Sequence, residues 1–427
     1  MRALARWLYG ALLWVLTPAY LLRLWRRGAR EPAYRERWGE RLGRYGYPAP
    51  TPRRLLWLHA VSLGETRAAA PLVEALRAQQ PGLRLLLTTS TATGWAAGRP
   101  LLRAGDVHTW LPYDTPGAVR RFLRHHRPLM GVLMETEVWP NLLHVAAAER
   151  VPMVLANARL SEKSLKRGER FAWLLRPAAE AFLRVLAQTQ DDARRLRDMG
   201  APSVEVCGNL KFDIAPPPAL LARGQHWRAA LQRPVVLAAS TREGEEGPLL
   251  AAWRELPQPR PLLLLVPRHP QRFDEVAALV EQANFSLRRR SAWGEGDPDA
   301  DAAQADVWLG DSIGEMALYY ACADAGLLGG SFEPLGGQNL IEAAACGCPL
   351  VLGPHTFNFA EAAELAVQAR AAMRAADMRQ GVVYAAMLAI DPQRNGWVER
   401  SLTFASRHRG ATERMAERIV GLLPAVV

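Results

Sequence analysis

The stretch Leu55-Leu56-Trp57-Leu58-His59-Ala60-Val61-Ser62-Leu63-Gly64-Glu65 decides the fold class. It begins as a short apolar run, and its polar end leads into a helical pattern at residues 66–78. An apolar run of this length that is followed by a helix is typical of a strand buried on both faces of a parallel sheet. The sequence therefore predicts an α/β protein.

The same pattern recurs along the chain in two series. Apolar runs at residues 84–89, 130–134 and 153–156 complete the first series. After Pro216-Pro217-Pro218 the second series begins, with strand candidates at 235–239, 262–266, 307–309 and 325–328, and helical patterns at 247–255 and 272–282. Two α/β halves in 427 residues predict two Rossmann-like domains, with ligands at the carboxyl ends of the strands and between the domains. We expect three segments: a basic membrane anchor at 1–47, an N-terminal domain at 48–214 and a C-terminal domain at 215–427.

The first fifty residues combine positive charge with an apolar run. They hold ten Arg and three Glu, a net +7 of the chain's +11, and Trp7 to Leu22 carries no charge. As a helix this run is about 24 Å long, somewhat short for a bilayer core. No small-x-small cleavage site follows and the downstream flank is strongly basic, which disfavours a signal peptide. We expect an anchor that spans the membrane or lies in its interface, two alternatives that the sequence leaves open, with the bulk of the chain in the cytoplasm.

Composition excludes several classes of protein. With 49% apolar and 22% charged residues, the chain is folded rather than disordered. Its four cysteines form no C-x-x-C pair, which is typical of a reducing compartment and predicts neither disulfides nor a metal site. Neither a Walker A motif nor G-x-G-x-x-G occurs, so nucleoside triphosphatase and dehydrogenase activities lack their motifs. The basic segment beside an apolar one indicates an anionic membrane surface rather than a nucleic acid.

Three candidate catalytic residues lie in the first half. Glu65 falls in the first turn of a helix, where the helix dipole favours an ionised general base; the S-x-x-E spacing from Ser62 also fits a capping box, which spacing alone favours. Glu135 follows a strand, in a position that suits acid–base or hydroxyl-binding roles, although helix capping also explains it. Lys211 has the charge to balance a phosphate or a sugar carboxylate, and the alternative is a surface Lys paired with Asp213.

Candidate nucleotide-binding residues lie in the second half. Arg268 follows an apolar strand and is placed to meet phosphate, whereas a buried His with a satisfied ring is the commoner interpretation of His269. The segment Gly310–Met316 offers backbone groups to a base edge. A glycine-rich loop at 329–337 runs into a helix, an arrangement that cradles phosphate, and Glu342 in that helix suits ribose hydroxyls.

Taken together and in this order, the motifs resemble those of the 3-deoxy-D-manno-octulosonic acid (Kdo) transferase family. They are H-A-x-S-x-G-E, E-T-E-x-W-P-N, N-A-R-L-S, G-N-x-K-F-D, S-T-x-E-G-E-E, V-P-R-H-P-x-R-F, G-D-x-x-G-E and G-G-x-N-x-x-E, after the basic apolar N-terminus. The sequence departs from the usual family pattern at Arg242, Gln338, Ala343 and Ala344.

The resemblance implies a GT-B glycosyltransferase fold, with two Rossmann-like domains facing each other across a cleft, and no metal or other cofactor. It implies CMP-Kdo as donor and a lipid A precursor as acceptor, at the cytoplasmic face of the inner membrane. The N-terminal domain would bind the acceptor and the C-terminal domain the CMP-sugar. Glu65 would be the general base, and Glu135 and Lys211 would stabilise the transition state. The residues implied for CMP binding are Arg268, His269, Ile313, Gly314, Glu315, Asn339, Leu340, Ile341 and Glu342.

Two alternatives from other classes stay open at this point. One keeps the fold and uses another nucleotide sugar, as a UDP-sugar transferase or epimerase does. The other is a membrane-tethered binding protein without catalysis, which the joint presence of Glu65, Glu135 and Lys211 disfavours.

Overall fold

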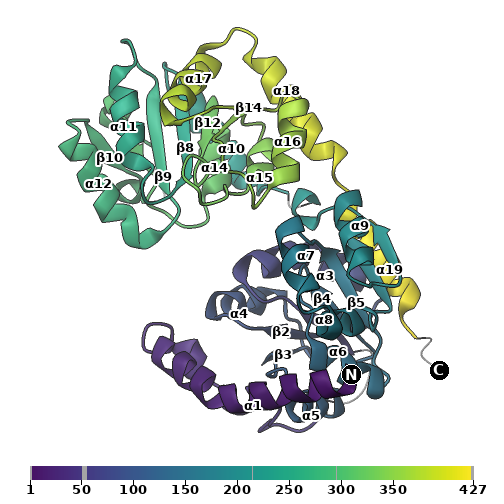
Figure 1. Cartoon of the computed structure of the whole chain (residues 1–427). Coiled ribbons are helices and arrows are strands. Elements are labelled where there is room, and N and C mark those ends of the chain that lie inside the picture. Colours follow the sequence, from purple (N-terminus) through teal and green to yellow (C-terminus); the bar gives the residue numbers. More distant parts are fainter. Residues whose placement is uncertain (1, 51–54, 214, 295, 425–427) are drawn as a thin grey trace. The chain divides into compact units, whose positions relative to one another are not determined.

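The chain folds into two compact units. The computed structural model describes residues 2–50, 55–213, 215–294 and 296–424. The first unit comprises 1–213 together with 409–427, and the second comprises 214–408 (Figure 1). Residues 1, 214 and 427, at which predicted segments begin or end, lie outside the described residues.

A parallel sheet forms the centre of the first unit. Within the described residues it has seven strands in the order β3-β2-β1-β4-β5-β6-β7. The strands are β1 (Leu55–His59), β2 (Arg84–Thr89), β3 (Val107–Trp110), β4 (Met130–Met134), β5 (Met153–Ala158), β6 (Arg184–Ala187) and β7 (Val204–Val206). β1 pairs with β2 on one side and β4 on the other, so its carboxyl end lies beside theirs. The α/β prediction is confirmed.

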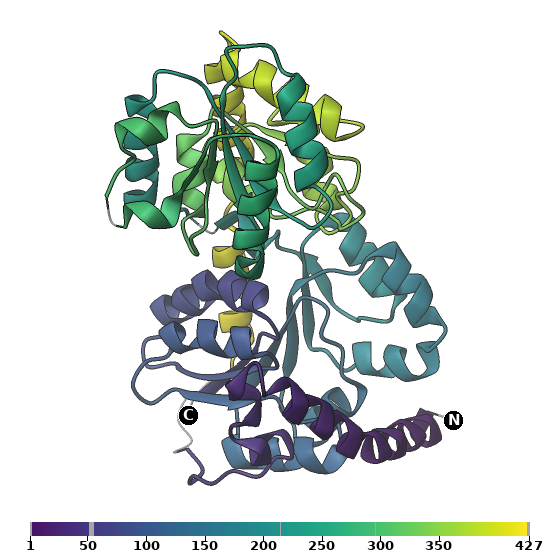
Figure 2. The same ribbon diagram turned by 90° about the vertical axis from the view of Figure 1, so that its left-hand side faces the viewer.

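Helices cover both faces of this sheet (Figure 2). The helices of the unit are α1 (Arg2–Arg27), α2 (Trp38–Arg41), α3 (Leu63–Gln79), α4 (Ala92–Gly98), α5 (Pro116–His126), α6 (Pro140–Ala148), α7 (Glu162–Glu169), α8 (Ala172–Ala179), α9 (Gln190–Asp198) and α19 (Ala411–Leu422), with short 3₁₀ turns η1 (Pro32–Arg35), η2 (Arg99–Leu101) and η3 (Leu210–Asp213). Alternate residues of β1 enter opposite cores, because successive side chains of a strand point to opposite faces. Leu56 and Leu58 pack with α3, and Leu55 and Trp57 pack with α5 and α6.

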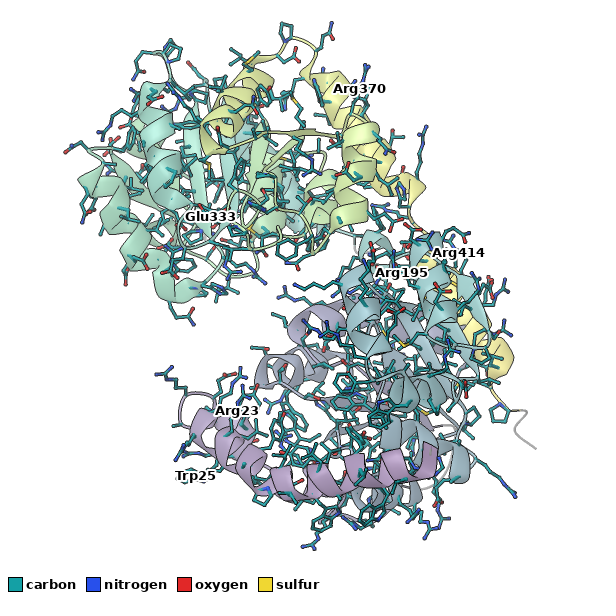
Figure 3. All side chains as sticks on the ribbon, viewed as in Figure 1. Arg23, Trp25, Arg195, Glu333, Arg370 and Arg414 are labelled. Atoms are coloured by element: carbon teal, nitrogen blue, oxygen red, sulfur yellow. The ribbon has the colours of Figure 1, made fainter. Side chains whose placement is uncertain are left out.

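The C-terminal helix α19 belongs to the first unit. Asp213 caps it, accepting hydrogen bonds from the backbone N–H groups of Gly410 and Thr412, both at 2.6 Å. Met415 and Ile419 are fully buried in the same core as α3. Arg414, labelled in Figure 3, donates to the carbonyl oxygen of Cys207 at 3.0 Å. In this last segment the structure differs from the predicted C-terminal domain, 215–427, because the amphipathic helix covers the first sheet and not the second.

The second unit repeats the architecture. Its described residues form a parallel sheet in the order β10-β11-β9-β8-β12-β13-β14. The strands are β8 (Val235–Thr241), β9 (Leu262–Pro267), β10 (Leu287–Arg289), β11 (Val307–Leu309), β12 (Ala325–Leu328), β13 (Leu350–Leu352) and β14 (Ala372–Arg374). The helices are α10 (Pro218–Ala230), α11 (Glu246–Glu255), α12 (Phe273–Gln282), α13 (Ala300–Gln304), α14 (Met316–Cys322), α15 (Leu340–Ala345), α16 (Ala360–Gln368), α17 (Met378–Ile390) and α18 (Arg394–Arg407), with η4 (Pro270–Arg272) and η5 (Arg290–Trp293). The predicted pair of Rossmann-like domains is therefore present.

Helix α1 lies along the first unit. Its segment Arg6–Arg27 is long and apolar enough to cross a bilayer, and 11% of its apolar window is buried. One side is held to the unit: the Tyr9 hydroxyl donates to Asp114 at 3.0 Å, and Tyr20 packs edge-on against Tyr113 with ring centroids 5.0 Å apart. The other side exposes large apolar residues, among them Trp7, Trp14 and Trp25. Figure 3 labels Arg23 and Trp25 near the end of this helix.

Candidate active site

Glu65 begins helix α3 directly after β1. The Ser62 hydroxyl caps this helix by accepting from the Glu65 backbone N–H, and it donates to Glu65 Oε1 at 3.1 Å, while the Val61 N–H donates to Oε2 at 2.8 Å. The capping arrangement therefore exists, and it fixes the carboxylate while each oxygen keeps a second lone pair. Burial is the main cause that raises the pKa of Glu65, and nearby Glu135 and Glu137 raise it further. The effect of burial on the pKa of Glu65 thus exceeds the opposite effect expected from the helix dipole. A carboxylate with a raised pKa binds a proton more strongly, so Glu65 is a stronger base once it is ionised.

Glu135 lies at the end of β4, between two cations. It is 5% exposed, with Arg159 Nε at 2.9 Å from Oε2 and Lys211 Nζ at 3.1 Å from Oε1. Its φ of +57° places it in the left-handed region, where non-glycine residues are uncommon. Such backbone conformations concentrate at functional sites. The structure thus brings two predicted catalytic residues, Glu135 and Lys211, into direct contact.

The loop that carries Lys211 is fixed by amide side chains. Asn157 Oδ1 accepts from the Leu210 N–H at 3.1 Å, and Asn209 Oδ1 accepts from the Lys211 N–H at 3.0 Å. Asn209 also donates to Gln188 at 3.0 Å. The predicted alternative, a surface Lys paired with Asp213, is wrong, because Lys211 pairs with Glu135 and Asp213 caps α19.

Sequence reasoning did not assign two further residues of this edge. The N-A-R-L-S motif, which follows a strand, marked the region of Arg159, but the sequence did not indicate which carboxylate this residue would bind. His59 ends β1, is 0% exposed, and has its Nε2 3.8 Å from Glu137 Oε2. Its apolar neighbours in the sequence gave no sign that this ring reaches a carboxylate.

In the second unit, positive charge gathers after β8 and β9. Arg268 and His269 are both exposed, so the expectation of a buried His269 is wrong. Among the described residues, the guanidinium groups of Arg242 and Arg268 form no ion pair. Desolvation lowers the pKa of His269, and Arg242, Arg268 and Arg272 lower it further. This surface is therefore suited to an anionic ligand such as a phosphate.

The segment after β11 exposes its backbone. Ile313 is 75% exposed, and Gly314 has φ +90° with open space where a side chain would begin. Glu315 is instead tied to the protein, with Arg290 Nη2 2.8 Å from Oε1. Burial alone would raise the pKa of Glu315, but hydrogen bonds from Ser312 and Arg290 outweigh it and lower the pKa. Main-chain groups at 313–314 are thus available to a ligand, while the Glu315 carboxylate holds the loop.

The glycine-rich loop is held by a residue that sequence reasoning did not single out, Glu245. This carboxylate is 1% exposed and accepts from the N–H groups of Gly330 at 2.7 Å, Arg242 at 2.8 Å and Phe332 at 3.1 Å. Gly329 must lack a side chain, because a Cβ there would lie 2.3 Å from the Ser240 carbonyl oxygen.

The loop leads into α15, where the remaining predicted residues lie. Asn339 caps this helix, with Oδ1 accepting from the Ile341 N–H at 3.2 Å. Leu340 and Ile341 are each 1% exposed, main chain included, so both of these predicted residues are buried in the structure. Glu342 is half-buried.

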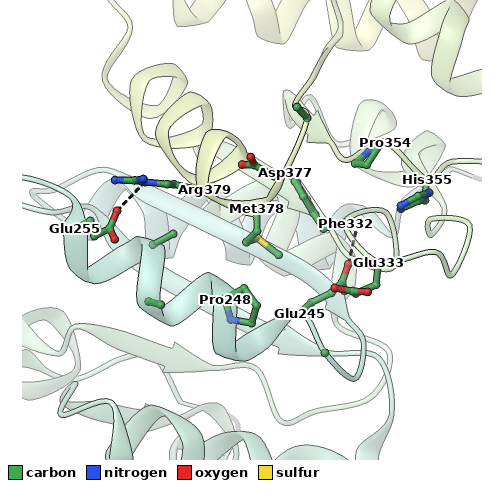
Figure 4. A pocket seen from close by; sticks show the side chains of 14 residues that line it. Glu245, Pro248, Glu255, Phe332, Glu333, Pro354, His355, Asp377, Met378 and Arg379 are labelled. Carbon is green, nitrogen blue, oxygen red and sulfur yellow. Dashed lines mark hydrogen bonds and ion pairs between the residues drawn. The ribbon is translucent and has the colours of Figure 1, made fainter.

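A cavity of about 460 Å³ lies in the second unit beside α11, the glycine-rich loop and the start of α17 (Figure 4). Its lining includes Phe332, Glu333, His355 and Met378. As far as the chain is described, none of the predicted CMP-binding residues lines it. Phe332 and Glu333, which belong to the glycine-rich loop, form one side of the cavity.

Comparison with known proteins establishes the family. A family model described as 3-deoxy-D-manno-octulosonic-acid transferase (kdotransferase) matches residues 36–214. The chain is 48% identical to 3-deoxy-D-manno-octulosonic acid transferase of Bordetella pertussis, over 97% of this chain and 99% of that relative. The chain belongs to the Kdo transferase family. The same enzyme of Haemophilus influenzae is 36% identical over 85% of each chain.

The fold also agrees with this family. The crystal structure of a glycosyltransferase from Rickettsia africae is 12% identical, covers 88% of this chain and 100% of its own, and has a TM-score of 0.58, which shows a shared fold. The predicted Kdo transferase family and the predicted GT-B class are confirmed, and the chain is a glycosyltransferase of lipopolysaccharide biosynthesis. Because the chain belongs to a family of transferases, we discard the alternative of a membrane-tethered binding protein without catalysis.

Proposed function

We propose that this Kdo transferase moves Kdo from CMP-Kdo to a hydroxyl group of a lipid A precursor, with Glu65 as general base and without a metal ion. The observation that carries the proposal is the cluster of Glu65, Glu135 and Lys211 at the carboxyl edge of the first sheet, in a chain 48% identical throughout to a Kdo transferase.

The chemistry follows from the groups present. Glu65 takes the proton of the acceptor hydroxyl while that oxygen bonds to the anomeric carbon of Kdo. The bond from this carbon to the CMP phosphate breaks, and its electron pair leaves on the phosphate oxygen. In such reactions the sugar ring becomes positive and the leaving group negative. The buried Glu135 carboxylate matches the first charge, and Lys211 and Arg159 hold this carboxylate in place.

The donor groups of the second unit support a CMP-sugar. CMP has a single phosphate, for which the exposed Arg268 offers a guanidinium and the positive-φ glycines at 330, 336 and 337 offer a loop without side chains that a phosphate can approach closely. The exposed backbone at Ile313 and Gly314 suits the base edge. These cationic and N–H donors supply the charge balance for which other transferases use Mg²⁺.

For the membrane we propose that α1 lies in the interface at the cytoplasmic face of the inner membrane. Contacts spread along the helix, at Arg6, Tyr9 and Tyr20, hold one side to the first unit. A helix that crossed the bilayer would have to leave these contacts. The opposite side offers exposed Trp and Leu to lipid, and Arg23, Arg26 and Arg27 suit anionic headgroups.

Kdo transfer by the purified protein, followed by mass spectrometry of the lipid with EDTA present, tests the reaction. We expect a mass increase of one or more Kdo units from CMP-Kdo and none from UDP-sugars. Transfer that needs a UDP-sugar, or that stops with EDTA and returns with Mg²⁺, would contradict the donor or the metal-free mechanism. For the anchor, Leu4→Cys should react with an impermeant maleimide only after spheroplasts are lysed. Labelling of intact spheroplasts would indicate a spanning helix.

A further inference from the structure

The imidazole of His59 has one nitrogen committed and one without a partner. Nδ1 lies 3.0 Å from the Thr88 carbonyl oxygen and 2.9 Å from its Oγ1. A carbonyl oxygen only accepts, so we assign the proton to Nδ1. Nε2 is buried and has no hydrogen-bond partner among the described residues. A buried polar atom without a partner costs about 1–3 kcal/mol.

The nearest acid to this nitrogen is Glu137. Its Oε2 accepts from Trp139 Nε1 at 2.6 Å and lies 3.8 Å from His59 Nε2. This separation is too long for a hydrogen bond but suits an ion pair. A proton on Nε2 would therefore turn the contact between His59 and Glu137 into an imidazolium–carboxylate pair.

The charges of this edge show why such a pair matters. Three carboxylates, Glu65, Glu135 and Glu137, interact electrostatically, and the two permanent cations, Lys211 and Arg159, both bind Glu135. In the part of the chain that the structure describes, Glu65 and Glu137 form no ion pair with Lys or Arg. The strand neighbours of His59 are the uncharged Thr88 and Leu133.

We propose that His59 is a positioning residue of the transfer reaction: protonated at Nε2 and paired with Glu137, it supplies the positive charge that keeps Glu65 a carboxylate, ready to accept the proton of the acceptor hydroxyl. The proposal rests on the proposed function of Glu65 as base. His59 keeps its own proton throughout, and the proton of the hydroxyl goes to Glu65.

The pH dependence of kcat/KM for Kdo transfer tests this role. Loss of a nearby positive charge makes a carboxylate harder to ionise, so His59→Gln should move the acid limb upward by about 0.5–1 pH unit. In His59→Gln/Glu137→Gln both charges are gone, and the limb should return towards that of the wild type. His226→Gln, an exposed residue of the second unit, is the matched control and should leave the profile unchanged.

The outcomes separate this inference from the proposed function. If wild-type protein transfers no Kdo, or if Glu65→Gln keeps its activity, the assignment of the base fails. If Glu65→Gln is inactive but His59→Gln loses rate equally at every pH, His59 is merely structural and this inference is overturned. Should the His59 variants not fold, selective ¹⁵N-histidine spectra of the wild type decide. The resonance that responds to Glu137→Gln must show both ring nitrogens protonated at the midpoint of the acid limb, and a neutral ring there refutes the proposal.

Discussion

Replacement of Glu245 by Ala should loosen the glycine-rich loop of the second unit. The carboxylate is 1% exposed and accepts three backbone N–H bonds, from Arg242, Gly330 and Phe332. It joins the loop after β8 to the loop after β12. Alanine removes both acceptor oxygens, and the three N–H donors lose this partner.

The magnitude follows from these contacts. A buried donor that loses its partner costs about 1–3 kcal/mol. Part of this loss of stability is offset, because Glu245 is itself buried at a cost in free energy. Burial raises its pKa, which means that its ionised form is less favourable in the folded protein than in water. We therefore expect a loss of about 3 kcal/mol, which for a unit of this size lowers the melting temperature by about 6–12 °C.

Calorimetric melting and titration with CMP measure both consequences. The transition of the second unit should move down by that amount, and CMP affinity should fall because Gly330 is no longer held. Glu243→Ala, an exposed neighbour, should change neither quantity. A melting temperature within about 2 °C of the wild type, with CMP affinity unchanged, would refute the reasoning.

Four other outcomes are expected. Glu65→Gln should abolish Kdo transfer while CMP affinity, measured by calorimetry, stays unchanged. Because burial raises the pKa of Glu65, wild-type kcat/KM should fall as the pH drops through a value above the usual 4.5, which a pH profile checks. Lys211→Gln should lower kcat by about 10²-fold, since Arg159 still neutralises Glu135, and exposed Lys166→Gln should not; steady-state assays distinguish them. Burial raises the pKa of Asp114 to about 7, so the stability of the wild type should decline as the pH rises from about 4 to 7, whereas Asp114→Asn should show a flatter dependence in thermal melts.

Most of the buried strands could be predicted because they are continuous apolar runs, although β13, which is also apolar and buried, was not predicted. The runs at 84–89, 130–134, 307–309 and 325–328 coincide with β2, β4, β11 and β12. Strands such as β3, β7 and β10 were not predicted, because they are short and carry His, Thr, Glu or Arg. Such residues are tolerated near the edge of a sheet, where one side of the strand is less covered.

For the site, the positions of residues after strands were predictable, but their partners were not. Lys211 and Glu135 lie 76 positions apart in the sequence, and the folding of the chain from β4 to the loop after β7 brings them together. Local spacing offered a pair between Lys211 and Asp213 as an alternative, which fails because Asp213 caps a helix that begins about 200 residues later. Burial, which controls the proton affinity of Glu65, is likewise a property of the assembled core.

The docking of α19 on the first sheet has a consequence for the order in which the protein matures. Met415 and Ile419 complete the core against which α3, the helix of Glu65, packs. During translation the first unit therefore emerges early but stays unfinished while the ribosome makes residues 214–408. Helix α3 and Glu65 reach their final environment only after the second unit has been synthesised, so a nascent chain stalled before α19 holds an incomplete transferase.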